Sequence, residues 1–185
     1  MKIRLNTVRL AFPQLWEAKT VNGEGNPAFS ATFLIPRDHP QMKAIQEVVE
    51  AVAKDKWGEK APAMLKQLRA QDKALCHDGD LKASYEGFGG HLYINARNTT
   101  RPLVIDRDKA PLVAADGRPY AGCYVNALID VWAQDNNYGK RINASLMGVQ
   151  FVKDGDAFAG GGVASEDDFD SCADLSVGEE EESLV

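Results

Sequence analysis

The sequence has few of the features that would place it outside ordinary globular proteins. Only 3 of its 185 residues are cysteines, and Cys76, Cys123 and Cys172 form no CxxC pair and leave one thiol over. This excludes a disulfide framework and favours a reducing compartment. No apolar run approaches the roughly 18 residues of a membrane span, and the N-terminus alternates charged and apolar residues instead of forming a signal-peptide core. We therefore expect a cytoplasmic protein that does not enter a membrane.

The usual marks of an enzyme are also missing. The sequence has no GxxxxGK[ST] phosphate loop, and its histidines lie in unrelated contexts that offer no nucleophile–base pair. Asp78 with Asp80, and Asp106 with Asp108, resemble the carboxylate pairs of metal nucleases, but each pair lies among turn residues without a third ligand nearby in sequence. We expect no enzymatic activity, no cofactor and no metal site.

Positive charge is absent from residues 154–185, which contain eleven Asp and Glu residues and no Lys or Arg. The whole chain has 21 Lys and Arg against 27 Asp and Glu, so residues 1–153 carry a net charge of +5 and the end of the chain −11. Because Gly160-Gly161-Gly162 supplies a flexible entry, we expect a disordered acidic tail over 154–185. Such a tail either keeps the protein soluble or occupies a cationic groove in competition with nucleic acid.

The end of the tail has the composition of a hook for protein partners, because two apolar residues follow an acidic run. The candidate partner-binding residues are Glu179, Glu180, Glu181, Glu182, Leu184 and Val185.

Alternation of apolar and polar residues predicts six strands, over 2–12, 28–36, 91–97, 102–106, 122–133 and 140–152. In the first strand the apolar phase slips at Asn6-Thr7, which is typical of a β-bulge in a bent strand. Residues 13–27 contain turn residues and are expected to form a long hairpin loop.

After Pro36 the apolar period changes to three and four, which predicts a helix capped by Asp38 and ended by Gly58, and a second helix over 61–73. The sequence therefore predicts a mainly β domain over 1–153 with a helical insertion at about 38–73. Five or six bent strands favour a Greek-key barrel of the OB-fold type, and a β-sandwich is the alternative.

The polar phase of the strands carries aromatic rings and cations. In 91–97 the alternation places Ile94 toward the core and Tyr93 on the opposite face, and in 122–133 it leaves Tyr124 and Trp132 outside. Unpaired bases stack on such rings whatever their identity, for about 1–3 kcal/mol each, while Arg and Lys neutralise phosphates. Individual rings can instead pack beneath loops or the insertion. The candidate nucleic-acid-binding residues are Tyr93, Arg97, Arg101, Arg118, Tyr124, Trp132, Lys140 and Arg141.

Several short stretches, in order along residues 1–169, resemble the tailed-phage single-stranded DNA-binding proteins, a family with an OB-fold. They are Arg9-Leu10-Ala11-Phe12-Pro13, Tyr93-Ile94-Asn95-Ala96-Arg97 with Arg101-Pro102 and Val104-Ile105-Asp106, Tyr120-Ala121-Gly122-Cys123-Tyr124, Gly148-Val149-Gln150, and Gly160-Gly161-Gly162 leading to Glu166-Asp167-Asp168-Phe169. The resemblance implies sequence-independent coating of single-stranded DNA during phage DNA replication or recombination in a bacterial host cell. It also implies an acidic tail that contacts replication proteins.

Two other functions stay open at this point. One is an interaction protein or nucleic-acid mimic in which the acidic tail binds and the barrel is a scaffold, although a mimic should be acidic throughout. The other is a metal-dependent nuclease that uses the paired carboxylates.

Overall fold

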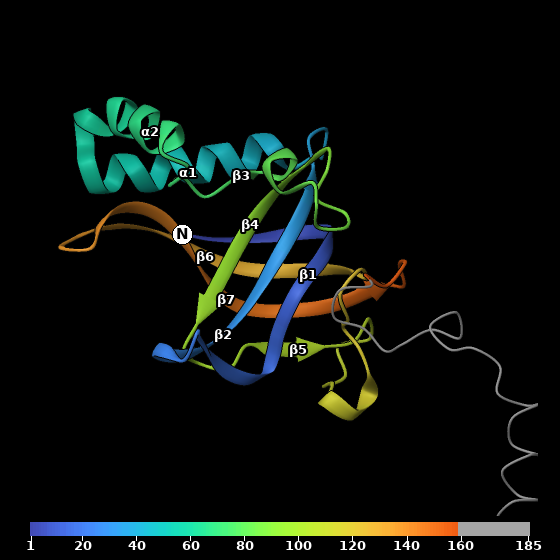
Figure 1. Ribbon diagram of the computed structural model, residues 1–185. Coiled ribbons are helices and arrows are strands. Elements are labelled where there is room, and N and C mark those ends of the chain that lie inside the picture. Colours follow the sequence, from blue (N-terminus) through green and yellow to red (C-terminus); the bar gives the residue numbers. More distant parts are fainter. Residues whose placement is uncertain (159–185) are drawn as a thin grey trace, which may run out of the picture.

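Five strands close into a barrel in the computed structural model, which describes residues 1–158 (Figure 1). They are β1 (Lys2–Val21), β2 (Glu24–Pro36), β4 (His91–Asn98), β6 (Tyr124–Asn136) and β7 (Gly139–Lys153). Antiparallel pairing runs β4–β2–β1–β6–β7, and a parallel pairing of Arg97 with Ser145 joins β4 to β7. This closed order is that of an OB-fold, so the predicted Greek-key barrel is confirmed. Two short strands, β3 (His77–Asp78) and β5 (Leu103–Ile105), extend the sheet at its edges.

Strand β1 bends twice, at two residues with a positive φ. The first is Thr7 (φ 51°), where the pairing with β6 shifts between Leu5 and Val8, so the predicted bulge is confirmed. The second is Phe12 (φ 46°), where the pairing with β2 shifts between Ala11 and Gln14. Each bulge moves the inward-facing phase by one residue, as a β-bulge does.

The predicted long loop over 13–27 is wrong, because β1 and β2 continue as a ribbon to a tight turn. Only Asn22 and Gly23 form the turn, both with positive φ (52° and 75°), the conformation that a two-residue hairpin requires. The turn-forming residues at 25–27 instead occupy the exposed start of β2. Leu15, which is buried in the core, shows that β1 continues into the part predicted as loop.

Two helices, α1 (Met42–Trp57) and α2 (Ala61–Ala70), form the predicted insertion and cover one end of the barrel, at the top of Figure 1. The apolar side of α1, with Ile45 and Val49, and Leu65 and Leu68 of α2 join the barrel interior in one continuous core. Gly58 ends α1 with a positive φ (57°), as predicted, and a 3₁₀ turn (Gly58–Lys60) links the helices.

The start of α1 differs from the expectation, because Asp38 does not cap it. The residue before the helix is Gln41, which makes no side-chain cap, and its backbone N–H donates to Nδ1 of His39 at 3.1 Å. The other ring nitrogen of His39 lies 2.8 Å from the carbonyl oxygen of Asn6. A histidine thus ties the entry of the helix to the first bulge of β1.

Residues 154–158, which were assigned to the tail, pack on the barrel, and Phe158 is buried. The rest of the predicted tail lies outside the described residues, including Gly160 to Gly162 and all six candidate partner-binding residues. Within residues 1–158 neither helix has the length and apolar character needed to cross a bilayer.

Candidate nucleic-acid interface

The outer face of β2 and β4 is the part of an OB barrel on which oligonucleotides are bound, between the hairpin loops of the first two and last two strands. Figure 1 shows β2 and β4 at the front, with the β1–β2 and β6–β7 hairpins both on the left. Cross-strand pairs on this face are Leu34 with Tyr93, Thr32 with Asn95 and Ser30 with Arg97. The face is thus apolar at one end and polar along the rest.

Two exposed rings stand beside the apolar end of this face. Phe12 from the second bulge of β1 is 51% exposed, and Tyr85 from the loop after β3 is 49% exposed. Their ring centroids lie 5.3 Å apart with an interplanar angle of 88°, and the buried ring of Phe88 lies below both. Exposed rings held in place by other rings are suited to stacking with bases.

Sequence reasoning missed both rings. Phe12 continues the apolar phase of Val8 and Leu10, so alternation places it in the core, and only the following Pro13, which cannot donate to a ladder, hints at an irregularity. Tyr85 lies in a glycine-rich loop where periodicity carries no information.

The loop that carries Tyr85 is held down by carboxylates that the sequence offered as a nuclease pair. Arg37 donates to Asp78 and Asp80, and Asp80 also accepts a 2.7 Å hydrogen bond from the backbone N–H of Gly90. The hydrogen bond from Gly90, helped by the nearby Arg37, lowers the pKa of the Asp80 carboxyl. Within residues 1–158 no three His, Cys, Asp or Glu side chains come together as a metal site. These carboxylates organise a loop instead.

Tyr93 does not offer an exposed ring, although its predicted strand phase is confirmed. It lies opposite the core residue Ile94, but the side chain is only 5% exposed because the loop over 79–90 covers it. Its ring stacks on His77 at 5.0 Å and meets Phe88 edge-on at 5.2 Å. Burial raises the pKa of the Tyr93 hydroxyl, and Asp72 and Asp78 add to the effect. Tyr93 is therefore a packing residue beneath the candidate site.

Two further candidates are engaged elsewhere. Tyr124 is half-buried between Arg9, 5.8 Å from its centroid, and Lys153, 4.9 Å away. Arg118 forms a 2.7 Å ion pair with Asp106, and this hydrogen bond lowers the pKa of the Asp106 carboxyl. The structure does not bring these two residues together with the face of β2 and β4.

Arg97 and Trp132 do lie on neighbouring parts of the outer surface. Arg97 is exposed on β4, and its guanidinium donates to the carbonyl of Asn26 at 2.7 Å. Its Cα partner on β7 is Ser145, whose Oγ accepts a 3.1 Å hydrogen bond from the indole N–H of Trp132. Trp132 is 43% exposed. A cation and a second ring thus stand on the polar side of the face.

The remaining candidate cations are also exposed. Lys140 and Arg141 are exposed in the β6–β7 hairpin, and the side chain of Tyr138 at its tip is 91% exposed. Arg101 is exposed after β4 and donates to the carbonyl of Trp16 at 2.9 Å. No ion pair occupies Arg97, Arg101, Lys140 or Arg141 within residues 1–158.

The last described residues run beside the ring pair. Arg9 donates to the Asp156 carbonyl at 2.7 Å and lies 4.4 Å over the ring of Phe158, whose backbone N–H donates to Ala121 at 3.0 Å. At Gly122 a Cβ would lie 2.2 Å from the Asp156 carbonyl oxygen, so only glycine allows this approach. We call residues 154–158 the C-terminal strap. A cavity of about 480 Å³ lies between the strap and the rings of Phe12 and Tyr85.

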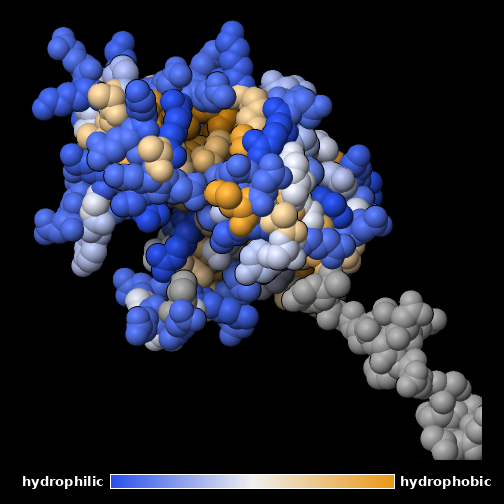
Figure 2. Space-filling model, turned by 45° about the horizontal axis from the view of Figure 1, so that its top comes forward, coloured by the Kyte–Doolittle hydropathy of each residue, from blue (hydrophilic) through white to orange (hydrophobic). Residues whose placement is uncertain are grey.

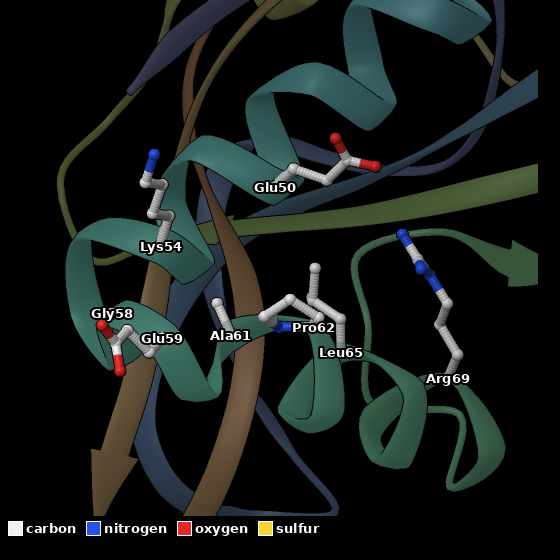
Figure 3. A pocket seen from close by; sticks show the side chains of 8 residues that line it. All are labelled: Glu50, Lys54, Gly58, Glu59, Ala61, Pro62, Leu65 and Arg69. Atoms are coloured by element: carbon white, nitrogen blue, oxygen red, sulfur yellow. The ribbon is translucent and has the colours of Figure 1, made fainter.

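Other apolar surface lies away from this face. Figure 2 shows hydrophobic side chains gathered in a few places on a largely hydrophilic surface. A cavity of about 650 Å³ opens between α1 and α2, where Ala61, Pro62 and Leu65 lie between the charged side chains of Glu50, Lys54, Glu59 and Arg69 (Figure 3). Its mixed charges give no cradle for a row of phosphates.

The sequence was compared with known protein families and with curated proteins. Residues 1–184 match the family described as Enterobacter phage Enc34, ssDNA-binding protein. Protein p50 of Acyrthosiphon pisum secondary endosymbiont phage 1 is 50% identical over 188 residues, which cover the whole of both chains.

Solved structures of phage single-stranded DNA-binding proteins are also similar to this chain. The single-stranded DNA-binding protein from bacteriophage Enc34, solved in complex with ssDNA, is similar with 30% identity and a TM-score of 0.73, covering 85% of this chain and 89% of that one. A second structure of the single-stranded DNA-binding protein from bacteriophage Enc34 gives 31% identity and a TM-score of 0.68, over 91% and 90% of the two chains. The single-stranded DNA-binding protein gp2.5 of bacteriophage T7 shares the fold, with 11% identity and a TM-score of 0.56 over 89% and 98% of the two chains. The chain belongs to the Enc34 family of phage single-stranded DNA-binding proteins.

Proposed function

We propose that the protein binds single-stranded DNA, without a required base sequence, along the outer face of β2 and β4. The observation that carries the proposal is the exposed ring pair of Phe12 and Tyr85, held in place beside a polar strand face. This face ends in Arg97, which forms no ion pair within residues 1–158. The DNA complex of the Enc34 relative supports the choice of ligand.

Binding would combine stacking and phosphate neutralisation. One base stacks on Phe12 or Tyr85, and Trp132 offers a second ring beyond Arg97. Lys140 and Arg141 in the β6–β7 hairpin flank the bound DNA strand and neutralise its phosphates. Every base has an apolar face, so stacking gives affinity without sequence readout, while the cations make the affinity strongly salt-dependent.

The acidic tail would regulate access to this face. The strap holds Phe158, the residue that precedes 159–185 in the chain, next to the cavity beside Phe12 and Tyr85. A tethered segment of net negative charge acts at a high effective concentration and competes with DNA phosphates for the same cations. Its end, Leu184-Val185 after four Glu residues, would bind replication or recombination proteins of the phage or host.

A titration with one labelled oligonucleotide, presented single-stranded and as a duplex, tests the proposal. We expect the single strand to bind much more tightly and its affinity to fall linearly with salt on a log–log plot. Equal affinity for both forms, or no salt dependence, would overturn it.

A further inference from the structure

The β6–β7 hairpin extends beyond the barrel as an arm, which we define as residues 134–141. Figure 1 shows it projecting from the barrel beneath the helical insertion, at the left. The two strands stay paired along the arm, Gln134 with Arg141 and Asp135 with Lys140. Two paired strands alone have marginal stability in water, so the direction of the arm depends on support from another element.

The two sides of the arm continue the two sides of the barrel wall. Ala133 and Ile142, the last pair before the arm, pack in the core. Side chains alternate along a strand, so Asp135 lies on the side of this pair and Arg141 lies on the opposite, outer side. The arm therefore turns a carboxylate toward the insertion and a guanidinium toward the outer surface.

Arg141 extends a row of outer side chains that begins on β4. Arg97 of β4 pairs with Ser145 of β7, and Arg141 lies four residues before Ser145 on the same side of that strand. At about 3.3 Å per residue, these two positions on β7 are about 13 Å apart. Arg141 can therefore neutralise a second phosphate of a strand that contacts Arg97, provided that the arm keeps its direction.

One hydrogen bond ties the arm to the insertion. The indole N–H of Trp57, the last residue of α1, donates to Oδ2 of Asp135 at 2.9 Å. Among the hydrogen bonds that join residues 1–158, it is the one that reaches the arm from outside the hairpin. Trp57 is half-buried and packs against the core, and an ionised acceptor makes a stronger hydrogen bond than a neutral one. The arm is thus anchored to a fixed point on the insertion.

We propose that Trp57 is a positioning residue for DNA binding, which holds the arm through Asp135 in the direction in which Arg141 meets the DNA strand. The helical insertion then not only closes one end of the barrel but also sets the shape of the DNA-binding surface. The inference rests on the proposed function and adds to it an element that does not itself contact DNA. Without this hydrogen bond, DNA binding has to order the arm, which lowers the affinity about two- to tenfold.

The test compares two variants of equal charge at Asp135. Asp135→Asn removes the negative charge but keeps a carbonyl oxygen that accepts from the indole, whereas Asp135→Ala removes both. Loss of the charge favours DNA binding equally in the two, so their difference isolates the hydrogen bond. Asp135 is exposed, and neither substitution removes core packing. The quantity measured is the dissociation constant of the full-length protein for one labelled single-stranded oligonucleotide, by fluorescence anisotropy over a series of salt concentrations.

We expect Asp135→Ala to bind about two- to tenfold more weakly than Asp135→Asn, with a log–log salt slope shallower by up to about 0.7, the share of the Arg141 contact. Trp57→Phe keeps an aromatic ring without the N–H and should show the same changes relative to the unmodified protein. Adding it to Asp135→Ala should cause no further loss, because both changes remove one hydrogen bond. In an Arg141→Ala background, Asp135→Ala and Asp135→Asn should bind equally.

Equal affinities and slopes in Asp135→Ala and Asp135→Asn would overturn the inference while leaving DNA binding intact. A difference that persists in the Arg141→Ala background would also overturn it, because Asp135 would then not act through Arg141. Failure of the unmodified protein to bind the oligonucleotide would instead refute the proposed function itself.

Discussion

Replacing Phe12 should weaken DNA binding while leaving the fold intact, whereas replacing Tyr93 should destabilise the fold. Half of the Phe12 side chain is exposed, and its contacts are ring contacts with Tyr85 and Phe88. Loss of one stacked base costs about 1–3 kcal/mol, which corresponds to about a 5- to 150-fold weaker affinity. Loss of the contact with Tyr85 costs about 1 kcal/mol of stability, or about 2–4 °C in melting temperature.

Tyr93→Ala removes a ring packed against His77 and Phe88, and large-to-small changes of this kind cost about 3–5 kcal/mol. That loss lowers the melting temperature by about 6–20 °C. The assay is fluorescence anisotropy with one oligonucleotide beside calorimetric melting. Phe12→Gly is the matched variant, because glycine tolerates the φ of 46° at this position and separates loss of the ring from backbone strain. Wild-type affinity in Phe12→Ala and Phe12→Gly, or a stable Tyr93→Ala with weakened binding, would refute the assignment of the two rings.

Three further outcomes are expected. In Arg97→Ala the log–log salt slope of single-strand binding should become shallower by about 0.7, the share of one phosphate contact, whereas Arg118→Ala should leave the slope unchanged. Truncation after Phe158 should tighten binding at about 0.01 M salt, where the Debye length is about 30 Å, and the gain should shrink as salt rises; equal affinities at low salt would exclude competition by the tail. The hydrogen bond from Gly90 lowers the pKa of the Asp80 carboxyl. The ionised Asp80 carboxylate therefore stabilises the loop fully above the ordinary carboxyl pKa, and this stabilisation is lost as pH falls through the lowered pKa. Limited proteolysis of the loop with an acid-active protease should show this loss, and Asp80→Asn should remove that pH dependence.

The barrel itself could be predicted from alternation because its strands have one buried and one outer side. Over 123–131, which covers the first part of β6, the residues predicted to face inward, from Cys123 to Val131 in steps of two, are all buried. The period change after Pro36 likewise located both helices, since Ile45, Val49 and Leu65 all face the core. These patterns are local in sequence, and the structure follows them closely.

The candidate site could be predicted only in part, because coverage of a strand face is decided by segments far away in sequence. Alternation correctly placed Tyr93 outside the barrel, but it carries no information about the loop over 79–90, whose Phe88 packs against that ring. Arg97 and Trp132, which no distant segment covers within residues 1–158, were placed correctly as exposed side chains.

The second bulge of β1 links the shape of the barrel to the position of the ring pair. Leu10 and Leu15 are both buried although they are an odd number of residues apart, so the inward phase must change between them. The phase changes at Phe12, which is the extra residue of the bulge. Its ring therefore points to solvent instead of into the core. The bend that lets β1 pair with both β2 and β6 therefore also presents the ring. A variant that removes this bulge by deleting Phe12 would shift the register of β1 against β2, and both the fold and the ring pair would be lost together.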